Sequence, residues 1–388
     1  MKNRKLRMGM IGGGSDAMIG AVHRRAAFMD NEIELVCGMF SIDPEISKSS
    51  GLSYYVPEDR IYYSWEEMLE KEAALPEGER MDFVTIVTPN RFHFAPAAKA
   101  LELGFNVVLD KPMTFTLEEA LELREIVNRT GKTFALTHGY SAYPAIREMK
   151  KRIAEESIGK VRRVFVEYTQ GWLANRIELK GGNNAGWRTD PKRSGKGGCV
   201  GDIGTHAWHL VETVTGAKVT EICADLLRVA EGRPIDDDAC AFMRTDKGFT
   251  ALLQATQIAA GEENNIRLRV YGDKGGMEWW QQEPNSLYVK WLDRPAEVVR
   301  VGNGYLSDEA KWVTRTPGGH PEGFMEAFAN IYRNFALTIR ARHAGEEPTA
   351  AMLDFPGVED GVRGMQFVET MVQAGYDPEK KWHKWVEK

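Results

Sequence analysis

The stretch LRMGMIGGGSDA at residues 6–17 decides the fold that we expect for the N-terminal part of the chain. It begins with an apolar run suited to a buried strand and passes directly into three glycines. Gly12, Gly14 and Ala17 match a G-x-G-x-x-G/A fingerprint, which allows a tight turn, close approach of the backbone to a pyrophosphate and close helix packing. A helical pattern follows, and its N-terminus would face the anion. The stretch predicts a phosphate-binding turn in a βαβ unit, with a merely structural turn as the alternative.

Short apolar runs and amphipathic stretches alternate over the first third of the chain, which is typical of βαβ units around a parallel sheet. Further strands are expected at residues 34–40, 83–87, 106–109 and 133–137. Later in the chain, β-branched and aromatic stretches follow one another without intervening helices, which favours an antiparallel or mixed sheet. We therefore predict an α/β protein with a dinucleotide-binding domain at residues 1–137 and a second α/β domain at residues 138–388.

Bulk properties exclude several classes of function. A chain of 388 residues exceeds the size at which one hydrophobic core usually stops growing, so two domains are expected. A net charge of −6 offers no basic surface for nucleic acid, and no apolar run approaches the roughly 18 residues of a membrane span. The four cysteines lack the spacing of a metal or disulfide motif, so reduced thiols are expected. We predict a cytoplasmic protein without nucleic-acid or membrane partners.

The residue at the end of the second expected strand should contact the adenosine ribose. An acidic residue there binds the 2′-hydroxyl of NAD, whereas a small residue with a nearby arginine accommodates the 2′-phosphate of NADP. The candidates are Ser41 and Asp43, and Asp43 could equally cap the next helix. We expect NAD as the cofactor, and NADP stays open.

Polar side chains follow two expected strands at their carboxyl ends, where open α/β sheets bind ligands. Thr88, Asn90 and His93 follow one strand, and Asp-Lys-Pro at residues 110–112 follows the next. A lysine is ordinarily an exposed surface residue. Lys111, however, ends a very apolar strand and precedes a proline that restricts the backbone, so we expect its ammonium group in the crevice.

The stretch GGCVGDIGTH at residues 197–206 is dense in glycine and runs into an apolar segment. Asp202 and His206 are four residues apart and share one face if the stretch is helical. A carboxylate and an imidazole near one hydroxyl suit proton transfer, although a capping aspartate and a satisfied histidine explain this segment equally well. His206 and His209 lack a third strong metal ligand nearby, so no metal is expected.

Aromatic and polar side chains gather around a Gly-Gly pair at residues 181–182: Trp172, Arg176, Asn183, Asn184, Trp187 and Arg188. Aromatic faces beside amide and guanidinium donors suit a polyhydroxylated ring. The alternative for Trp172 is a place in the core.

Together these motifs resemble the Gfo/Idh/MocA oxidoreductases. The resemblance implies a Rossmann domain followed by an α/β domain whose large, open, mostly antiparallel mixed sheet makes a dimer or tetramer. It also implies that Lys111 hydrogen-bonds the reacting oxygen, that Asp202 orients the substrate and that His206 is the acid or base. The expected cofactor contacts are Gly12, Gly14, Ser15, Ala17, Ser41, Thr88, Asn90, His93, Lys111, Trp187 and Arg188. The expected substrate contacts are Lys111, Trp172, Asn183, Asp202 and His206.

The implied activity is hydride transfer between a nicotinamide and a secondary ring hydroxyl of a sugar or glycoside. The C3 hydroxyl of a glucoside is preferred, and an inositol comes second. A net non-redox enzyme that uses tightly bound NAD transiently and a nucleotide-sensing regulator are the alternatives. The presence of Lys111 and His206 speaks against the sensor. Asp110 replaces the glutamate usual before Lys-Pro, and His209 stands where many members carry a second aspartate.

Overall fold

The computed structural model describes residues 4–15, 17–180 and 183–387, with residues 183 and 184 described by their backbone alone. The chain divides into two compact units. The first comprises Met1–His138 and Phe328–Val362, and the second comprises Gly139–Ala327 and Arg363–Lys388. The chain first passes from one unit to the other after His138, one residue beyond the predicted boundary at residue 137. The prediction of one continuous C-terminal domain is wrong, because the chain returns to the first unit at Phe328.

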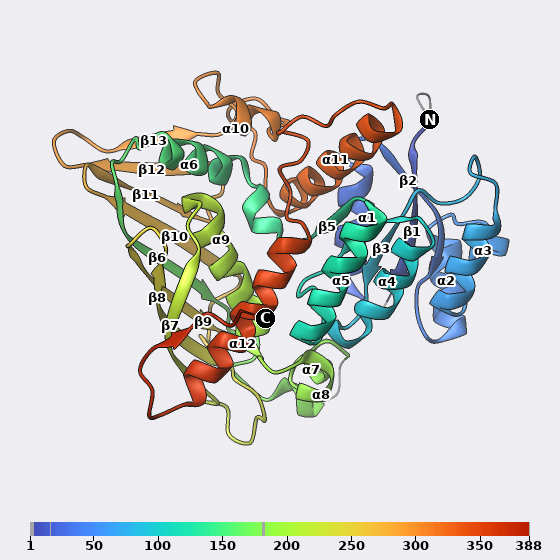
Figure 1. The fold of residues 1–388 in the computed structure, drawn as a ribbon, viewed down its shortest axis with the longest axis horizontal. Helices are drawn as coiled ribbons and strands as arrows, with labels where there is room; N and C mark the ends of the chain where they lie inside the picture. Colours follow the sequence, from blue (N-terminus) through green and yellow to red (C-terminus); the bar gives the residue numbers. More distant parts are fainter. Residues whose placement is uncertain (1–3, 16, 181–182, 388) are drawn as a thin grey trace. The chain divides into compact units, whose positions relative to one another are not determined.

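The first unit is built on a parallel sheet (Figure 1). Its strands are β1 (Leu6–Gly12), β2 (Ile33–Met39), β3 (Phe83–Val87), β4 (Asn106–Leu109) and β5 (Phe134–Leu136), in the order β2-β1-β3-β4-β5. The helices between them are α1 (Met18–Phe28), α2 (Pro44–Ser53), α3 (Trp65–Ala74), α4 (Phe94–Glu102) and α5 (Leu117–Thr130). Every residue of β3 and β4 is buried, which is typical of strands covered on both faces.

Local signals set the ends of α5. The Thr116 side chain accepts a hydrogen bond from the Glu119 backbone, and the Glu119 carboxylate accepts one from the Thr116 backbone. This reciprocal capping box satisfies two amides that the helix leaves unpaired. Gly131 ends the helix with a φ of 64°, a conformation that glycine adopts without strain.

Helix α11 (Phe324–His343) explains why the chain returns to the first unit. The Tyr332 hydroxyl lies 2.7 Å from His23 Nδ1 in α1 and 3.2 Å from Thr85 Oγ1 in β3. The Phe335 ring packs edge-on against Phe83 with 5.1 Å between centroids. These side chains are buried, so α11 completes the core of the sheet's domain.

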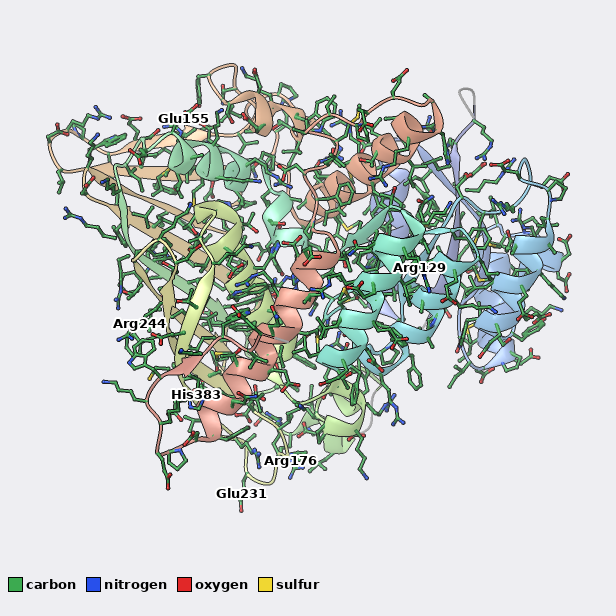
Figure 2. The ribbon with its side chains drawn as sticks, in the orientation of Figure 1. Arg129, Glu155, Arg176, Glu231, Arg244 and His383 are labelled. Carbon is green, nitrogen blue, oxygen red and sulfur yellow. The ribbon has the colours of Figure 1, made fainter. Side chains whose placement is uncertain are left out.

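The second unit carries a nine-stranded sheet in the order β13-β12-β11-β10-β6-β9-β8-β7-β14. Its strands are β6 (Val161–Thr169), β7 (Val219–Leu227), β8 (Asp238–Thr245), β9 (Thr250–Thr256), β10 (Asn265–Gly272), β11 (Gly275–Trp280), β12 (Ser286–Trp291), β13 (Glu297–Arg300) and β14 (His383–Lys384). All neighbours are antiparallel except β6 and β9, which are parallel. The predicted mixed, mostly antiparallel sheet is thus confirmed. At its edge His383, labelled in Figure 2, pairs with Ile222.

Helices cover one face of this sheet. They are α6 (Pro144–Ala154), α9 (Thr205–Thr215) and the later part of α12 (Val358–Tyr376), where Phe367 stacks on Trp208. Along β8, buried residues alternate with exposed ones, so the opposite face is open. Shorter helices are α7 (Asn183–Arg188), α8 (Pro191–Ser194) and α10 (Asp308–Trp312). Among the described residues no helix is both long and apolar enough to cross a bilayer.

Candidate functional site

The glycine-rich turn after β1 packs closely against its neighbours. Gly12 and Gly13 have φ angles of 82° and 73°, and a Cβ on Gly12 would lie 3.1 Å from the Val87 carbonyl oxygen. A Cβ on Gly20 would lie 2.3 Å from the Gly13 Cα, so Gly20 is where α1 packs closely on the turn. The expectation that Ala17 makes this contact is wrong, because Ala17 has extended backbone and only precedes the helix.

The backbone of this turn is tied to its surroundings. Gly14 N donates to Phe40 O at 2.9 Å, and Ser15 N donates to Ser50 Oγ at 3.0 Å. These two amides are therefore engaged within the protein, and the first turn of α1, whose amides have no acceptor within the helix, suits an anion better. The turn and the parallel sheet fit a dinucleotide. Asp16 lies outside the described residues.

At the end of β2, the structure shows what one of the two candidate ribose-binding residues does. Asp43 Oδ1 accepts hydrogen bonds from Glu45 N at 2.9 Å and Ile46 N at 3.3 Å, so Asp43 caps α2. Ser41 Oγ accepts one from Asp43 N at 3.2 Å. Ser41 is thus the polar side chain that remains at the carboxyl end of β2.

His93 joins the loops that follow β3 and β4. Its Nε2 lies 2.8 Å from Thr88 O and its Nδ1 lies 2.9 Å from Pro112 O. Burial lowers the pKa of His93, and the nearby Asp110 carboxylate opposes this effect. Because both ring nitrogens face backbone carbonyls, His93 positions the two loops, and its expected cofactor contact would have to come from ring carbons. Asn90 is buried in the same loop.

Lys111 stands at the carboxyl end of β4. Its backbone nitrogen donates to Asp110 Oδ1 at 2.8 Å, and Thr137 Oγ1 donates to the same oxygen at 2.9 Å. His23 Nε2 lies 4.0 Å from that oxygen. The Lys111–Pro112 peptide bond is cis. Asp110 therefore anchors the backbone from which the Lys111 side chain extends.

In the second unit, Asp236 anchors the start of the segment that carries Asp202 and His206. It is 1% exposed, and its carboxylate accepts hydrogen bonds from Gly198 N at 2.6 Å and Val200 N at 2.9 Å. A π-helical turn, Val200–Gly204, leads without a break into α9. Asp202 and His206 thus lie on one helical segment, as the sequence pattern predicts. Such π-turns are frequent at functional sites.

The Asp202 carboxylate is held by an amide and a guanidinium group. Its Oδ2 accepts a hydrogen bond from Gln257 Nε2 at 2.8 Å and lies 3.7 Å from Arg188 Nε. Gln257 Nε2 also donates to Gln170 Oε1 at 3.2 Å, and Trp172 Nε1 donates to that oxygen at 2.9 Å. The structure therefore brings Asp202 together with two of the other predicted site residues, Trp172 and Arg188.

His206 is 7% exposed and lies beside two phenols. Its ring meets the Tyr140 ring edge-on at 4.9 Å between centroids. The Tyr140 hydroxyl lies 2.7 Å from that of Tyr168, and both contact the Asn264 amide. Burial raises the pKa of both tyrosines, so they are neutral at ordinary pH. Gln170 Nε2 donates to Asn264 Oδ1 at 2.6 Å and joins this group to the Asp202 network.

The sequence reasoning missed five polar residues of this network: Tyr140, Tyr168, Gln170, Gln257 and Asn264. Two of them lie at the carboxyl ends of expected strands, but only the structure shows that these strands are parallel neighbours. Gln170 and Gln257 come directly after β6 and β9, which are parallel neighbours. The rule that ligands bind at the carboxyl ends of parallel strands therefore applies to them as well.

The remaining predicted residues lie in or near α7. The Arg188 guanidinium stands over the Trp187 ring at 4.4 Å. Asn183 begins α7, but its side chain lies outside the described residues. Within the part of the chain that the structure describes, no three His, Cys, Asp or Glu side chains form a metal cluster.

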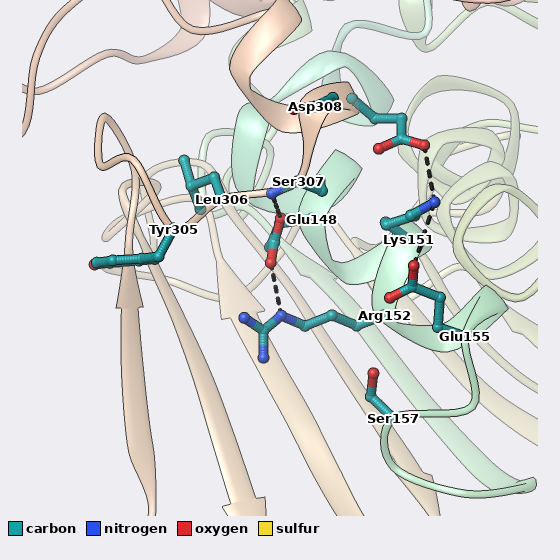
Figure 3. A pocket seen from close by; sticks show the side chains of 10 residues that line it. Glu148, Lys151, Arg152, Glu155, Ser157, Tyr305, Leu306, Ser307 and Asp308 are labelled. Atoms are coloured by element: carbon teal, nitrogen blue, oxygen red, sulfur yellow. Dashed lines mark hydrogen bonds and ion pairs between the residues drawn. The ribbon is translucent and has the colours of Figure 1, made fainter.

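A hollow of about 460 Å³ on the second unit is a poor candidate (Figure 3). It lies along α6 and α10, and most of its charges are paired with each other. Lys151 lies 3.3 Å from Glu155 and 3.2 Å from Glu309, and Arg152 lies 2.7 Å from Glu148. None of the predicted site residues lines it.

Comparison with known proteins shows that both units match models of the same family. Residues 6–138 match the model described as "Oxidoreductase family, NAD-binding Rossmann fold", and residues 146–278 match the GFO/IDH/MocA C-terminal domain. The uncharacterized oxidoreductase YfiI of Bacillus subtilis is 31% identical over 96% of this chain and 95% of its own. An inositol dehydrogenase homolog from Azotobacter vinelandii, solved with NAD+, is 33% identical, covers 99% of this chain and 98% of its own, and has a TM-score of 0.93. Its complex with NADH and myo-inositol is 32% identical over 99% of this chain and 98% of its own, with a TM-score of 0.91.

Proposed function

Because the chain belongs to the GFO/IDH/MocA family of NAD-binding oxidoreductases, we propose that it oxidises or reduces a ring carbon bearing a secondary hydroxyl in a sugar or cyclic polyol. NAD, when bound, supplies the nicotinamide ring that takes up or returns the hydride. The observation that carries the proposal is that Asp202 and His206 lie on a single helical segment. The Gln257 amide donates to the Asp202 carboxylate at 2.8 Å. A carboxylate and an imidazole so placed suit the proton transfer that accompanies hydride transfer.

In the oxidation direction, His206 takes the proton of the reacting hydroxyl, and the expected gain from such a base is about 10²–10⁴ in rate. Lys111 acts on the same oxygen and stabilises the developing negative charge with its ammonium group. Asp202 accepts a hydrogen bond from a neighbouring hydroxyl and so orients the ring. The family match across both units supports this division of roles.

The substrate class is a ring with several hydroxyl groups. The family resemblance implies the C3 hydroxyl of a glucoside first and an inositol second. The neighbour solved with myo-inositol, similar over 99% of this chain, supports the inositol-type ring instead. We therefore propose a cyclitol as the first substrate to test and a glucoside as the second.

The proposal is tested by mixing the purified protein with NAD or NADP and a panel of myo-inositol, glucose and methyl glucosides. We expect nicotinamide reduction with at least one ring polyol and with NAD in preference to NADP. A panel that leaves the nicotinamide absorbance unchanged overturns the proposed function. Isotope exchange at a substrate carbon without net NADH formation would instead favour the enzyme that uses bound NAD transiently.

We also propose that the enzyme is a dimer or tetramer assembled through the open face of the nine-stranded sheet. Half-buried aromatic and cationic groups gather there: Trp280 stacks on Tyr288 at 5.1 Å, and the Arg267 guanidinium lies 5.6 Å from the Trp280 ring. Such groups suit an interface between copies. Sedimentation velocity should show a Trp280→Asp variant with a smaller mass than the wild type.

A cytoplasmic location completes the proposal. The cysteines Cys37, Cys199, Cys223 and Cys240 are free thiols, which are typical of a reducing compartment. Fractionation of the source cells should recover the protein with the cytoplasmic enzymes.

A further inference from the structure

The amide of Gln257 is the buried link between Asp202 and Trp172. Its Nε2 lies within hydrogen-bond distance of both Asp202 Oδ2 and Gln170 Oε1, at 2.8 Å and 3.2 Å. Gln257 is 3% exposed, so water does not replace these bonds freely. A buried amide holds its partners in one arrangement, because leaving a hydrogen bond unmade there costs free energy.

The direction of every hydrogen bond in this link follows from the Trp172 indole. An indole nitrogen can only donate, so the Gln170 atom at 2.9 Å from it must be the amide oxygen. Gln257 faces the same oxygen and must therefore present its nitrogen. That nitrogen carries two N–H groups, and the second one points at Asp202 Oδ2, which must accept.

The far end of Gln170 reinforces this direction. Its Nε2 donates to Asn264 Oδ1 at 2.6 Å, and the Tyr168 hydroxyl donates to the same oxygen at 2.7 Å. Asn264 Nδ2 in turn donates to the Tyr140 hydroxyl at 2.8 Å. The Gln170 amide is therefore fixed at both ends, and a flip would place donor against donor.

We propose that Gln257 is a positioning residue that keeps Asp202 ionised and in one orientation for the substrate. This inference rests on the proposed function, in which Asp202 accepts a hydrogen bond from a substrate hydroxyl. Arg188 Nε, at 3.7 Å from the same Oδ2, adds a positive charge that also favours the ionised carboxylate. The direction of the relay makes Asp202 Oδ2 a hydrogen-bond acceptor, which favours the ionised carboxylate.

The sharpest variant is Gln257→Glu, which replaces the amide by a carboxyl of the same size. The new carboxyl and Asp202 would share one proton, because two like charges at hydrogen-bond distance cannot both ionise readily. While the proton is shared, the new carboxyl donates to Asp202 as the amide did, and only the bond to Gln170 Oε1 is lost. Once the pH exceeds the raised pKa of the pair, the two carboxylates repel each other and Asp202 leaves its position.

The experiment measures kcat/KM of the wild type and of Gln257→Glu over a range of pH. We expect the ratio of variant to wild type to fall by about tenfold per pH unit above the upper pKa of the pair. The matched control is Gln373→Glu on the exposed surface of α12, for which the ratio should stay constant. A Gln257→Glu ratio that is lowered equally at every pH overturns the proposal, because a merely structural role predicts that result.

A second measurement separates this inference from the proposed function. Infrared spectra of Gln257→Glu should show a protonated carboxyl band near neutral pH, and the band should vanish in Gln257→Glu combined with Asp202→Asn. The band needs no turnover, so it decides the role of Gln257 even if no ring polyol is a substrate. Its absence in the single variant overturns the contact with an ionised Asp202.

Discussion

Gln170 and Gln257 meet with 3.2 Å between Oε1 and Nε2 because each directly follows the last residue of one of two parallel neighbours. Thr169 ends β6, Thr256 ends β9, and these two residues are register partners. The two glutamines therefore leave the sheet side by side. One of them reaches Asp202 and the other reaches Trp172. The geometry of a strand pair thus fixes a polar network that connects residues far apart in the chain.

The roles proposed for Lys111 and His206 are tested by Lys111→Ala and His206→Ala. We expect each change to lower kcat by about 10²–10³, because a charge that stabilises the reacting oxygen, or the group that moves its proton, is lost. Steady-state kinetics checks this, with circular dichroism to establish that the variants fold. Lys99→Ala, on the exposed side of α4, is the control and should keep wild-type turnover. Near-normal turnover in either folded site variant would contradict the assignment.

Gly20→Ala should weaken NAD binding. The added Cβ would lie 2.3 Å from the Gly13 Cα, so α1 must move away from the turn. Overpacking of this kind costs about 1–3 kcal/mol in stability, and the displaced turn should raise the Kd for NAD. Calorimetric titration and thermal unfolding measure the two effects. Gly78→Ala, which meets nothing within 4 Å, should change neither, and equal effects at both positions would refute the explanation.

The stability of the first unit should depend on pH through His93. Burial lowers the pKa of this imidazole in the folded state, whereas the unfolded chain takes up a proton near pH 6.5. Protons then bind the unfolded state in preference, so the free energy of unfolding should fall as the pH drops below about 6.5, and the fall should stop below the folded pKa. Urea unfolding at a series of pH values checks this. A His93→Gln variant should show a shallower slope, and an unchanged slope would contradict a neutral His93.

Trp172→Phe should act on the substrate site through Gln170 while it keeps an aromatic ring. Without the indole N–H, the Gln170 amide is held only by its bond to Asn264, so the oxygen that Gln257 faces is less firmly fixed. We expect kcat/KM to fall by about tenfold, the order of one lost hydrogen bond in a buried network. In Trp291→Phe an indole bond to the exposed Glu297 is lost instead, and kcat/KM should change less than twofold. Equal losses in the two variants would argue against the relay.

Local sequence signals were sufficient for much of the fold. The apolar runs at β3 and β4, the capping box at Thr116 and the helical spacing of Asp202 and His206 all depend on neighbours within a few residues. Such features are encoded by hydrogen bonds and periodicity within one segment, so they can be predicted from the sequence. The Gfo/Idh/MocA resemblance rests on the same local motifs and is confirmed by the family matches.

Tertiary structure alone decided the contacts between distant segments. The parallel pairing of β6 with β9 places Gln170 beside Gln257, 87 residues apart in sequence, and α11 returns to pack Tyr332 against His23. Likewise, only the structure shows that Gly20 is the residue of α1 that packs on the turn, and that Ala17 precedes the helix. No local pattern encodes these pairings, because each depends on which surfaces exclude water together once the whole chain has folded.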